Sequence, residues 1–268
     1  MTSLLRSWDI GSARNPARRA GLVIALAQLP LRPLITLLSR PRWEGVEHLP
    51  EEAGAMIACG NHLSAFDAFG YGHLLQAHGI APRFLAKEAM FRVPVLGALL
   101  RAARQIPVRR GTSRGGDALA DARAALERGE LVMLFPEGTY TRDRALWPMQ
   151  GRLGAARLAL ETGTPLLPIA TWGGRALWPV GSPFPRPRPG RHVQTLVGEP
   201  YTVARRDGEN LQQAARRVTE ELMAKIAELL GQLRHEQPPR RLHDGSTDAH
   251  RPEVGRPQHG YRAWKQIS

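Results

Sequence analysis

The segment Asn61–Asp67 (NHLSAFD) holds the residues of this 268-residue chain best suited to acid–base chemistry. It follows the apolar run Ala55–Cys59, which we expect to be a strand, and α/β folds place functional groups at the carboxyl ends of strands. The unperturbed pKa of imidazole lies near neutrality, so His62 could act as a general base. If Asp67 lies in the first turn of the following helix, its carboxylate can hold the Nδ1 proton and leave Nε2 free.

Two other interpretations of this segment are open. Ser64 and Asp67 have the spacing of a capping box, although Glu or Gln is the usual partner, and a histidine beside a cap is then structural. Cys59 stands close enough to His62 in sequence to suggest a Cys–His nucleophile. As the last residue of an apolar strand, however, it is better interpreted as a small buried hydrophobe, and we expect no catalytic role for it.

Three further clusters stand where apolar runs end. Phe135–Thr139 (FPEGT) follows the run Leu131–Leu134, Ile106–Gly111 carries two arginines, and Leu167–Ile169 centres on a proline. If the runs are neighbouring strands, their ends converge on one edge of a sheet. The chain therefore predicts a single site assembled from four separate segments.

Short apolar runs alternate with helical patterns along the middle of the chain. This alternation predicts an α/β fold with a mixed, largely parallel central sheet flanked by helices. The predicted strands are Ala55–Cys59, Arg83–Ala86, Gln105–Val108, Leu131–Phe135, Leu166–Thr171 and Val193–Val197. The predicted helices are Ala65–His78, Val95–Ala103, Asp117–Arg128, Leu153–Thr162 and Glu209–Leu233.

Taken together, the four clusters resemble the glycerolipid acyltransferase family, which includes lysophosphatidic acid (1-acyl-glycerol-3-phosphate) acyltransferases. Asn61, His62 and Asp67 are similar to the family's first block. Ile106 to Arg110 is similar to the second, an Ile-Pro-Val-x-Arg pattern. Phe135–Thr139 matches the third without a change, and Leu167–Ile169 is similar to the fourth. The resemblance spans roughly residues 40–200, in the family's order and spacing.

The resemblance implies an O-acyltransferase that moves a fatty acyl group from acyl-CoA or acyl carrier protein to the free hydroxyl of a lysophospholipid. The implied acceptor is 1-acyl-glycerol-3-phosphate, giving phosphatidic acid, with His62 as base and Asp67 as its partner. No cofactor and no metal are implied. Glycerol-3-phosphate, another lysophospholipid or a glycolipid stays open as the acceptor. The implied substrate-binding residues are Arg110, Glu137, Gly138, Thr139, Arg142 and Arg152.

Two departures from the family pattern affect the cations. Tyr140-Thr141 precede Arg142 where the family often has Arg-Ser directly after Glu-Gly-Thr, and Arg152 stands where many members have lysine. Both arginines can still offer charge-assisted hydrogen bonds to a phosphate. The departures leave the acceptor headgroup open.

The formal net charge of +13, from 37 Lys+Arg against 24 Asp+Glu, favours an anionic partner. A nucleic-acid-binding module would explain the charge, but we find no zinc-ligand spacing or aromatic RNA-reading pattern, and the four clusters would remain unexplained. We therefore expect an anionic membrane surface and its lipids as partners, and no nucleic acid. The single cysteine excludes an internal disulfide.

The first 42 residues are basic and contain an apolar stretch, Ala20–Leu38, that prolines and polar residues interrupt before it could span a bilayer. The pattern predicts an amphipathic, membrane-associating helical segment, and packing on the protein's own core is the open alternative. Residues 43–235 are then the acyltransferase domain, and residues 236–268, which are polar and aperiodic, a disordered tail. We expect the protein at the cytoplasmic face of the cell membrane, peripheral or monotopic.

Overall fold

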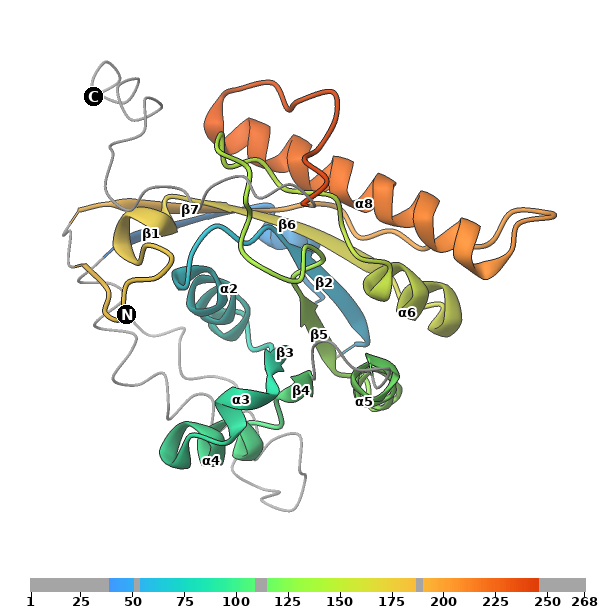
Figure 1. The fold of residues 1–268 in the computed structure, drawn as a ribbon, viewed down its shortest axis with the longest axis horizontal. Coiled ribbons are helices and arrows are strands. Elements are labelled where there is room, and N and C mark those ends of the chain that lie inside the picture. Colours follow the sequence, from blue (N-terminus) through green and yellow to red (C-terminus); the bar gives the residue numbers. More distant parts are fainter. Residues whose placement is uncertain (1–38, 51–53, 109–114, 187–189, 246–268) are drawn as a thin grey trace.

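The computed structural model describes residues 39–50, 54–108, 115–186 and 190–245, with the backbone alone at 115–118. Its seven-stranded sheet has the order β1-β7-β6-β2-β5-β3-β4 (Figure 1). Every neighbouring pair is parallel except β6 and β7. The predicted α/β fold with a mixed, largely parallel sheet is confirmed. The N-terminal helical segment predicted within residues 1–38 lies outside the described residues.

Every predicted strand and helix is observed close to its expected bounds, whereas four short elements, β1, η1, α3 and α7, were not predicted. In chain order the observed elements are β1 (Arg40–Glu44), η1 (Val46–His48), β2 (Met56–Gly60), α2 (Phe66–Ala77), β3 (Arg83–Lys87), α3 (Glu88–Phe91), α4 (Pro94–Ala102), β4 (Ile106–Val108), α5 (Gly115–Glu127), β5 (Leu131–Leu134), α6 (Gly154–Thr162), β6 (Leu166–Trp172), α7 (Gly174–Leu177), β7 (His192–Val197) and α8 (Leu211–Arg234).

Strand β1 was not predicted from the sequence. It lies at the edge of the sheet, where it pairs with β7 from Arg40↔His192 to Glu44↔Leu196. Its side chains alternate between exposed and half-buried, so it lacks an apolar run, and Pro41 is tolerated because an edge strand has one unpaired side. The predicted boundary after residue 42 therefore cuts through a strand, and the sheet begins at Arg40.

The central strands alternate their side chains between two cores, one on each face of the sheet. On β2, Ile57 and Cys59 pack in a core shared with α5, α6 and α8. Met56 and Ala58 point the other way, into a core that contains residues of α2. Because successive strand residues face opposite sides, a strand covered on both faces reads as a continuous apolar run. This is why β2 and β5 could be predicted.

Helix α8 begins with a capping box, in which the Asn210 side chain accepts from the N–H of Gln213 and the Gln213 side chain accepts from the N–H of Asn210. Residues beyond α8 return over the molecule, and the N–H of Gln150 donates to the carbonyl oxygen of His243 at 2.8 Å. These contacts differ from the expectation of disorder from residue 236 onward. No helix in the described ranges is long and apolar enough to cross a membrane.

Candidate active site

Asn61 fixes the loop after β2 by joining it to two other elements. Its Nδ2 donates to the carbonyl oxygen of Thr171 on β6 at 3.0 Å. Its Oδ1 accepts from the N–H of Thr171 and from the hydroxyl of Tyr71 on α2, both at 2.8 Å. Burial, and then the charges of Asp67 and Glu137, raise the pKa of Tyr71 well above its usual value, so its hydroxyl remains a donor. The next residue, His62, thus stands at the carboxyl edge of the sheet.

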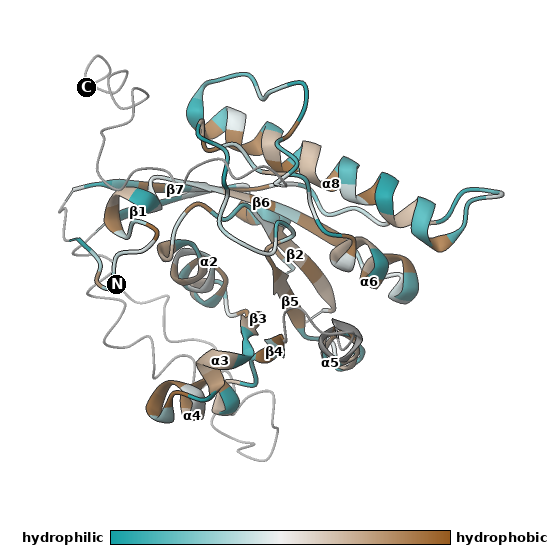
Figure 2. Cartoon of the chain, in the orientation of Figure 1, coloured by the Kyte–Doolittle hydropathy of each residue, from teal (hydrophilic) through white to brown (hydrophobic). Residues whose placement is uncertain are grey.

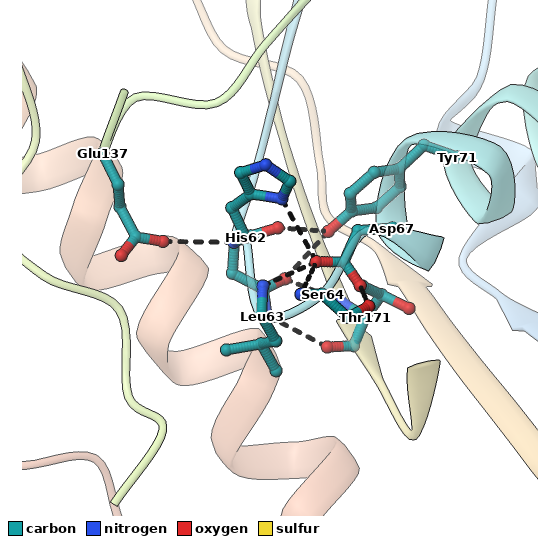
Figure 3. Close-up of polar contacts among 8 residues, drawn as sticks. His62, Leu63, Ser64, Asp67, Tyr71, Glu137 and Thr171 are labelled. Atoms are coloured by element: carbon teal, nitrogen blue, oxygen red, sulfur yellow. Dashed lines mark hydrogen bonds and ion pairs between the residues drawn. The ribbon is translucent and has the colours of Figure 1, made fainter. Parts of the chain in front are cut away.

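The Asp67 carboxylate lies in the first turn of α2 and turns back onto the preceding loop (Figure 3). Its Oδ2 accepts from the N–H groups of Leu63 at 2.5 Å and Ser64 at 2.7 Å. The same oxygen lies 3.3 Å from Nδ1 of His62. A carboxylate in this position favours the tautomer that carries its proton on Nδ1 and leaves Nε2 unprotonated. The contact that a His62–Asp67 pair requires is therefore present.

The alternative capping box is only half formed, because the Asp67 carboxylate accepts from the N–H of Ser64 but the Ser64 side chain accepts from no N–H of the helix. The N-cap residue of α2 is Ala65, and no side chain caps this end of the helix. The Ser64 hydroxyl instead donates to Oδ1 of Asp67 at 2.6 Å. Ser64 thus holds the carboxylate and does not satisfy a helix N–H. With an exposed fraction of 1%, Asp67 has its oxygens occupied by protein donors.

The His62 imidazole lies against two aromatic rings. Its centroid is 3.9 Å from that of Phe135, with 20° between the planes, and 4.2 Å from that of Tyr140. These rings restrict rotation of the imidazole, while 15% of the side chain stays exposed. In Figure 3 the second ring nitrogen is on the side away from Asp67. The ring can therefore exchange a proton with a molecule at the surface.

Glu137 connects the loop after β5 to the backbone of the site. Its Oε1 accepts from the N–H of His62 at 3.1 Å, and its Oε2 accepts from the N–H of Met149 at 3.0 Å. Burial raises the pKa of the Glu137 carboxyl to about 8, although both backbone N–H groups favour the charged form. The observed contacts give Glu137 a positioning role for the His62 backbone, beside the substrate-binding role that the resemblance implies for it.

The raised pKa of Glu137 predicts a pH-dependent stability. Between about pH 4.5 and about pH 8, the folded state keeps a proton that the unfolded chain has released. The free energy of unfolding should therefore fall as pH rises, by at most about 1.4 kcal/mol per pH unit from this group. Urea denaturation at several pH values across this window measures the slope.

Glu137→Gln should remove that slope. The substitution should also cost roughly 1–3 kcal/mol throughout, because an amide NH₂ then faces a backbone N–H. An unchanged slope in the Glu137→Gln protein would assign the pH dependence to another group.

The other predicted substrate-binding residues lie at different places in the structure. Gly138 has φ +68°, and a Cβ at this position would come within 2.7 Å of Nε of Arg152, so the Arg152 side chain lies over the turn beside Glu137. Thr139 follows in the same turn and is half-buried. Arg142 is exposed, and its Nη1 donates to the carbonyl oxygen of Gly245 at 2.8 Å. Arg110 lies outside the described residues.

Cys59 faces the core and not the site. The residue is fully buried among the side chains between the sheet and α5, α6 and α8. Burial raises the pKa of its thiol far above the usual range. A buried protonated thiol is a poor nucleophile, which agrees with the expectation that Cys59 has no catalytic role.

Sequence reasoning gave no role to several residues that build the site. Tyr71 and Thr171 stand outside the polar clusters, yet both hold Asn61. Tyr140 was noted only as a departure from a family pattern, although its ring contacts His62. An available signal was Asn61 itself, because an amide at the end of a buried strand must find partners.

Comparisons with known proteins find similarity to acyltransferases. A sequence model of the acyltransferase family matches residues 40–172. A chloroplastic 1-acyl-sn-glycerol-3-phosphate acyltransferase of Brassica napus is 31% identical over 140 residues, which are 52% of this chain and 39% of that protein. The matched chain thus spans about two fifths of the length of this relative.

Two further relatives match over more of their length. A 1-acyl-sn-glycerol-3-phosphate acyltransferase of Bacillus subtilis is 27% identical over 208 residues, which are 76% of this chain and 94% of that one. The crystal structure of the 1-acyl-sn-glycerophosphate acyltransferase PlsC from Thermotoga maritima superposes with a TM-score of 0.61 at 25% identity. It covers 81% of this chain and 83% of the other.

Proposed function

Because the acyltransferase family model matches residues 40–172, we propose that this chain transfers a fatty acyl group from a thioester, acyl-CoA or acyl carrier protein, to a lysophospholipid hydroxyl. The proposed acceptor is 1-acyl-glycerol-3-phosphate, and the product is phosphatidic acid. The relatives named above support this acceptor. The single observation that carries the chemistry is the 3.3 Å contact between Nδ1 of His62 and Oδ2 of Asp67.

In the proposed reaction, Nε2 of His62 removes the proton of the acceptor hydroxyl as that oxygen attacks the thioester carbonyl carbon. Asp67 stabilises the imidazolium that forms. The tetrahedral intermediate then breaks its C–S bond, and the leaving thiolate takes the proton from His62, so that an ester and a free thiol are released. A thioester is already activated, so no acyl-enzyme is needed. General-base help of this type is worth roughly 10²–10⁴-fold.

The experiment that tests this proposal is a thiol-release assay with acyl-CoA and a panel of acceptors. The panel contains 1-acyl-glycerol-3-phosphate, glycerol-3-phosphate, another lysophospholipid and a glycolipid. We expect the fastest acceptor-dependent release with 1-acyl-glycerol-3-phosphate. If no acceptor accelerates the release of free thiol, acyl transfer to a hydroxyl is rejected.

We propose that arginines bind the acceptor's phosphate, with Arg110 and Arg152 as the principal groups. Arg110→Ala and Arg152→Ala should each raise the KM for the phosphorylated acceptor about tenfold or more, through loss of a charge-assisted hydrogen bond. The donor's KM should barely change. Arg216→Ala is the matched control, because Arg216 is an exposed arginine of α8 and belongs to none of the predicted site segments. An equal loss with a phosphate-free acceptor would make these arginines structural.

The basic N-terminal segment is the proposed membrane contact, at the cytoplasmic face of the cell membrane. Since β1 begins at Arg40, a truncated chain starting at residue 39 keeps the whole sheet. It should float less with anionic vesicles than the full chain does, and keep activity on detergent-dispersed acceptor. High salt should weaken the binding of the full chain only in part, because apolar side chains also contribute. Equal flotation of both proteins would show that residues 1–38 are not the membrane contact.

A further inference from the structure

The α3–α4 hairpin, Glu88–Ala102, carries most of the large apolar side chains that the described part of the chain leaves exposed. Val95 is 83% exposed and Val93 49%. Figure 2 shows hydrophobic colouring along α4, which lies at the periphery of the fold beyond β3 and β4. Single exposed apolar residues are ordinary, but a cluster on one short segment marks an interaction site. The exposed members are Met90, Val93, Val95 and Leu99.

The apolar face points outward because the inner face of α4 is used for packing. Gly97 is buried against α3, and a Cβ at Gly97 would come within 2.0 Å of the carbonyl oxygen of Phe91. The two helices thus meet backbone to backbone. Val95 and Leu99 are four residues apart, so they share one face of α4. That face is left without a partner in the described structure.

The hairpin is held rigidly on the sheet. Within it, Nη1 of Arg101 donates to the carbonyl oxygen of Phe91 at 2.7 Å. At its base, the buried Arg83 of β3 donates from Nη1 to the carbonyl oxygen of Ala103 at 2.9 Å and pairs with Glu130 at 3.0 Å. The exposed apolar face is therefore a preformed surface and does not have to be ordered on binding.

The hairpin that carries the apolar face is basic. Lys87, Arg92 and Arg101 are exposed, and Glu88, 3.6 Å from Arg92, is the single acid between residues 87 and 102. An apolar face on a basic segment fits an anionic lipid surface. Residues 1–38 fit it poorly, because that segment is itself basic, with five arginines and one acid, Asp9. Charge therefore favours lipid over the chain's own N-terminal segment.

The hairpin starts at the edge of the sheet that carries the chemistry. Helix α3 follows β3 directly, and β3, β5 and β2 run parallel. The loops after β2 and β5 carry His62 and Glu137. A bilayer in contact with the hairpin would thus lie near the edge where a lipid hydroxyl must reach His62.

We propose that the α3–α4 hairpin is a membrane-docking surface for anionic bilayers. Its apolar side chains enter the region between headgroups and acyl chains, while Lys87 and Arg92 contact lipid phosphates. This contact is separate from the N-terminal segment. The docking proposal can be tested independently of the proposed acyl transfer, because vesicle binding is measured without turnover.

The first test compares two exposed positions in the full chain. Val95 and Phe184 are 83% and 75% exposed, and Phe184 lies between β6 and β7, away from the hairpin. Val95→Asp should weaken flotation with phosphatidylglycerol-containing vesicles at least about tenfold, because apolar burial is lost and a charge is added. Phe184→Asp should bind as the unmodified chain does. Equal binding by both variants would overturn the proposal.

A second test attaches a fluorophore to a cysteine introduced at an exposed position. Cys59 is fully buried, so a thiol-reactive, environment-sensitive fluorophore goes to an introduced cysteine. With Val95→Cys the emission should shift to the blue on adding anionic vesicles, and less so with phosphatidylcholine alone. The control Phe184→Cys should not respond. A blue shift that needs no vesicles and grows with protein concentration would instead show a second copy of the chain on this face, and would overturn the proposal.

Discussion

A His62→Ala protein is expected to fold and to lose acyl transfer by about two to four orders of magnitude. The loss should fall on kcat, because the imidazole acts on a proton and holds neither substrate in the proposed reaction. The residual rate would reflect positioning of the thioester and acceptor by the remaining groups. Steady-state thiol release with 1-acyl-glycerol-3-phosphate measures kcat for both proteins.

The fold of the His62→Ala protein can be checked independently. The imidazole stacks on Phe135 and contacts the tilted ring of Tyr140, so its loss should lower the free energy of unfolding by roughly 0.5–1.5 kcal/mol. His78→Ala is a matched control, because His78 lies at the other end of α2, with its Nδ1 2.8 Å from the carbonyl oxygen of Leu74. Near-normal turnover in a folded His62→Ala protein would reject His62 as the base.

Asp67→Asn should reduce activity by about three to four orders of magnitude and should also lower stability. An amide NH₂ facing Nδ1 of His62 would favour the wrong imidazole tautomer, with the proton on Nε2, which cannot then accept another. The carboxylate also accepts from the N–H groups of Leu63 and Ser64 and from the Ser64 hydroxyl. Removing the charge from this buried cluster should cost roughly 1–3 kcal/mol.

Ser64→Ala separates the two effects of Asp67. It removes one hydrogen bond to the carboxylate and leaves the contact with His62 in place. We expect a stability loss of about 1 kcal/mol and a change in kcat of less than about tenfold. If Ser64→Ala and Asp67→Asn lower kcat equally, Asp67 acts through the structure of the loop and not through the imidazole.

Much of the fold could be predicted because buried strands appear in the sequence as continuous apolar runs. Leu131–Leu134 and Leu166–Trp172 are covered on both faces, so every residue had to be apolar or small. The edge strand β1 carries no such signal, since its pairing with β7 rests on backbone hydrogen bonds that need no apolar side chain, and Pro41, which has no N–H, is accommodated on the unpaired side of the strand. The contact made by residues beyond α8 was missed for a similar reason, because the backbone of His243 makes it by accepting from the N–H of Gln150.

In the site, residue types could be predicted, but their partners could be predicted only where these lie close in sequence. His62 and Asp67 are five residues apart and meet through one loop and one helical turn, so local geometry sufficed. Glu137 was predicted as a site residue, yet nothing in its neighbours indicates that both oxygens accept from backbone N–H groups. The partners of Glu137 depend on how separate loops pack together at the edge of the sheet. The residues next to Glu137 in the sequence carry no information about that packing.

The anchoring of the His62 loop has a consequence for how the protein reaches its active form. The bonds from Asn61 to Thr171 span 110 positions of the sequence, and the bond from His62 to Glu137 spans 75. Contacts so distant along the chain form late, after the entropy of closing long loops has been overcome. A nascent chain that has not yet added β6 would hold the whole NHLSAFD segment without a positioned imidazole. Acyl transfer should then be among the last properties regained on refolding, after helical structure has returned.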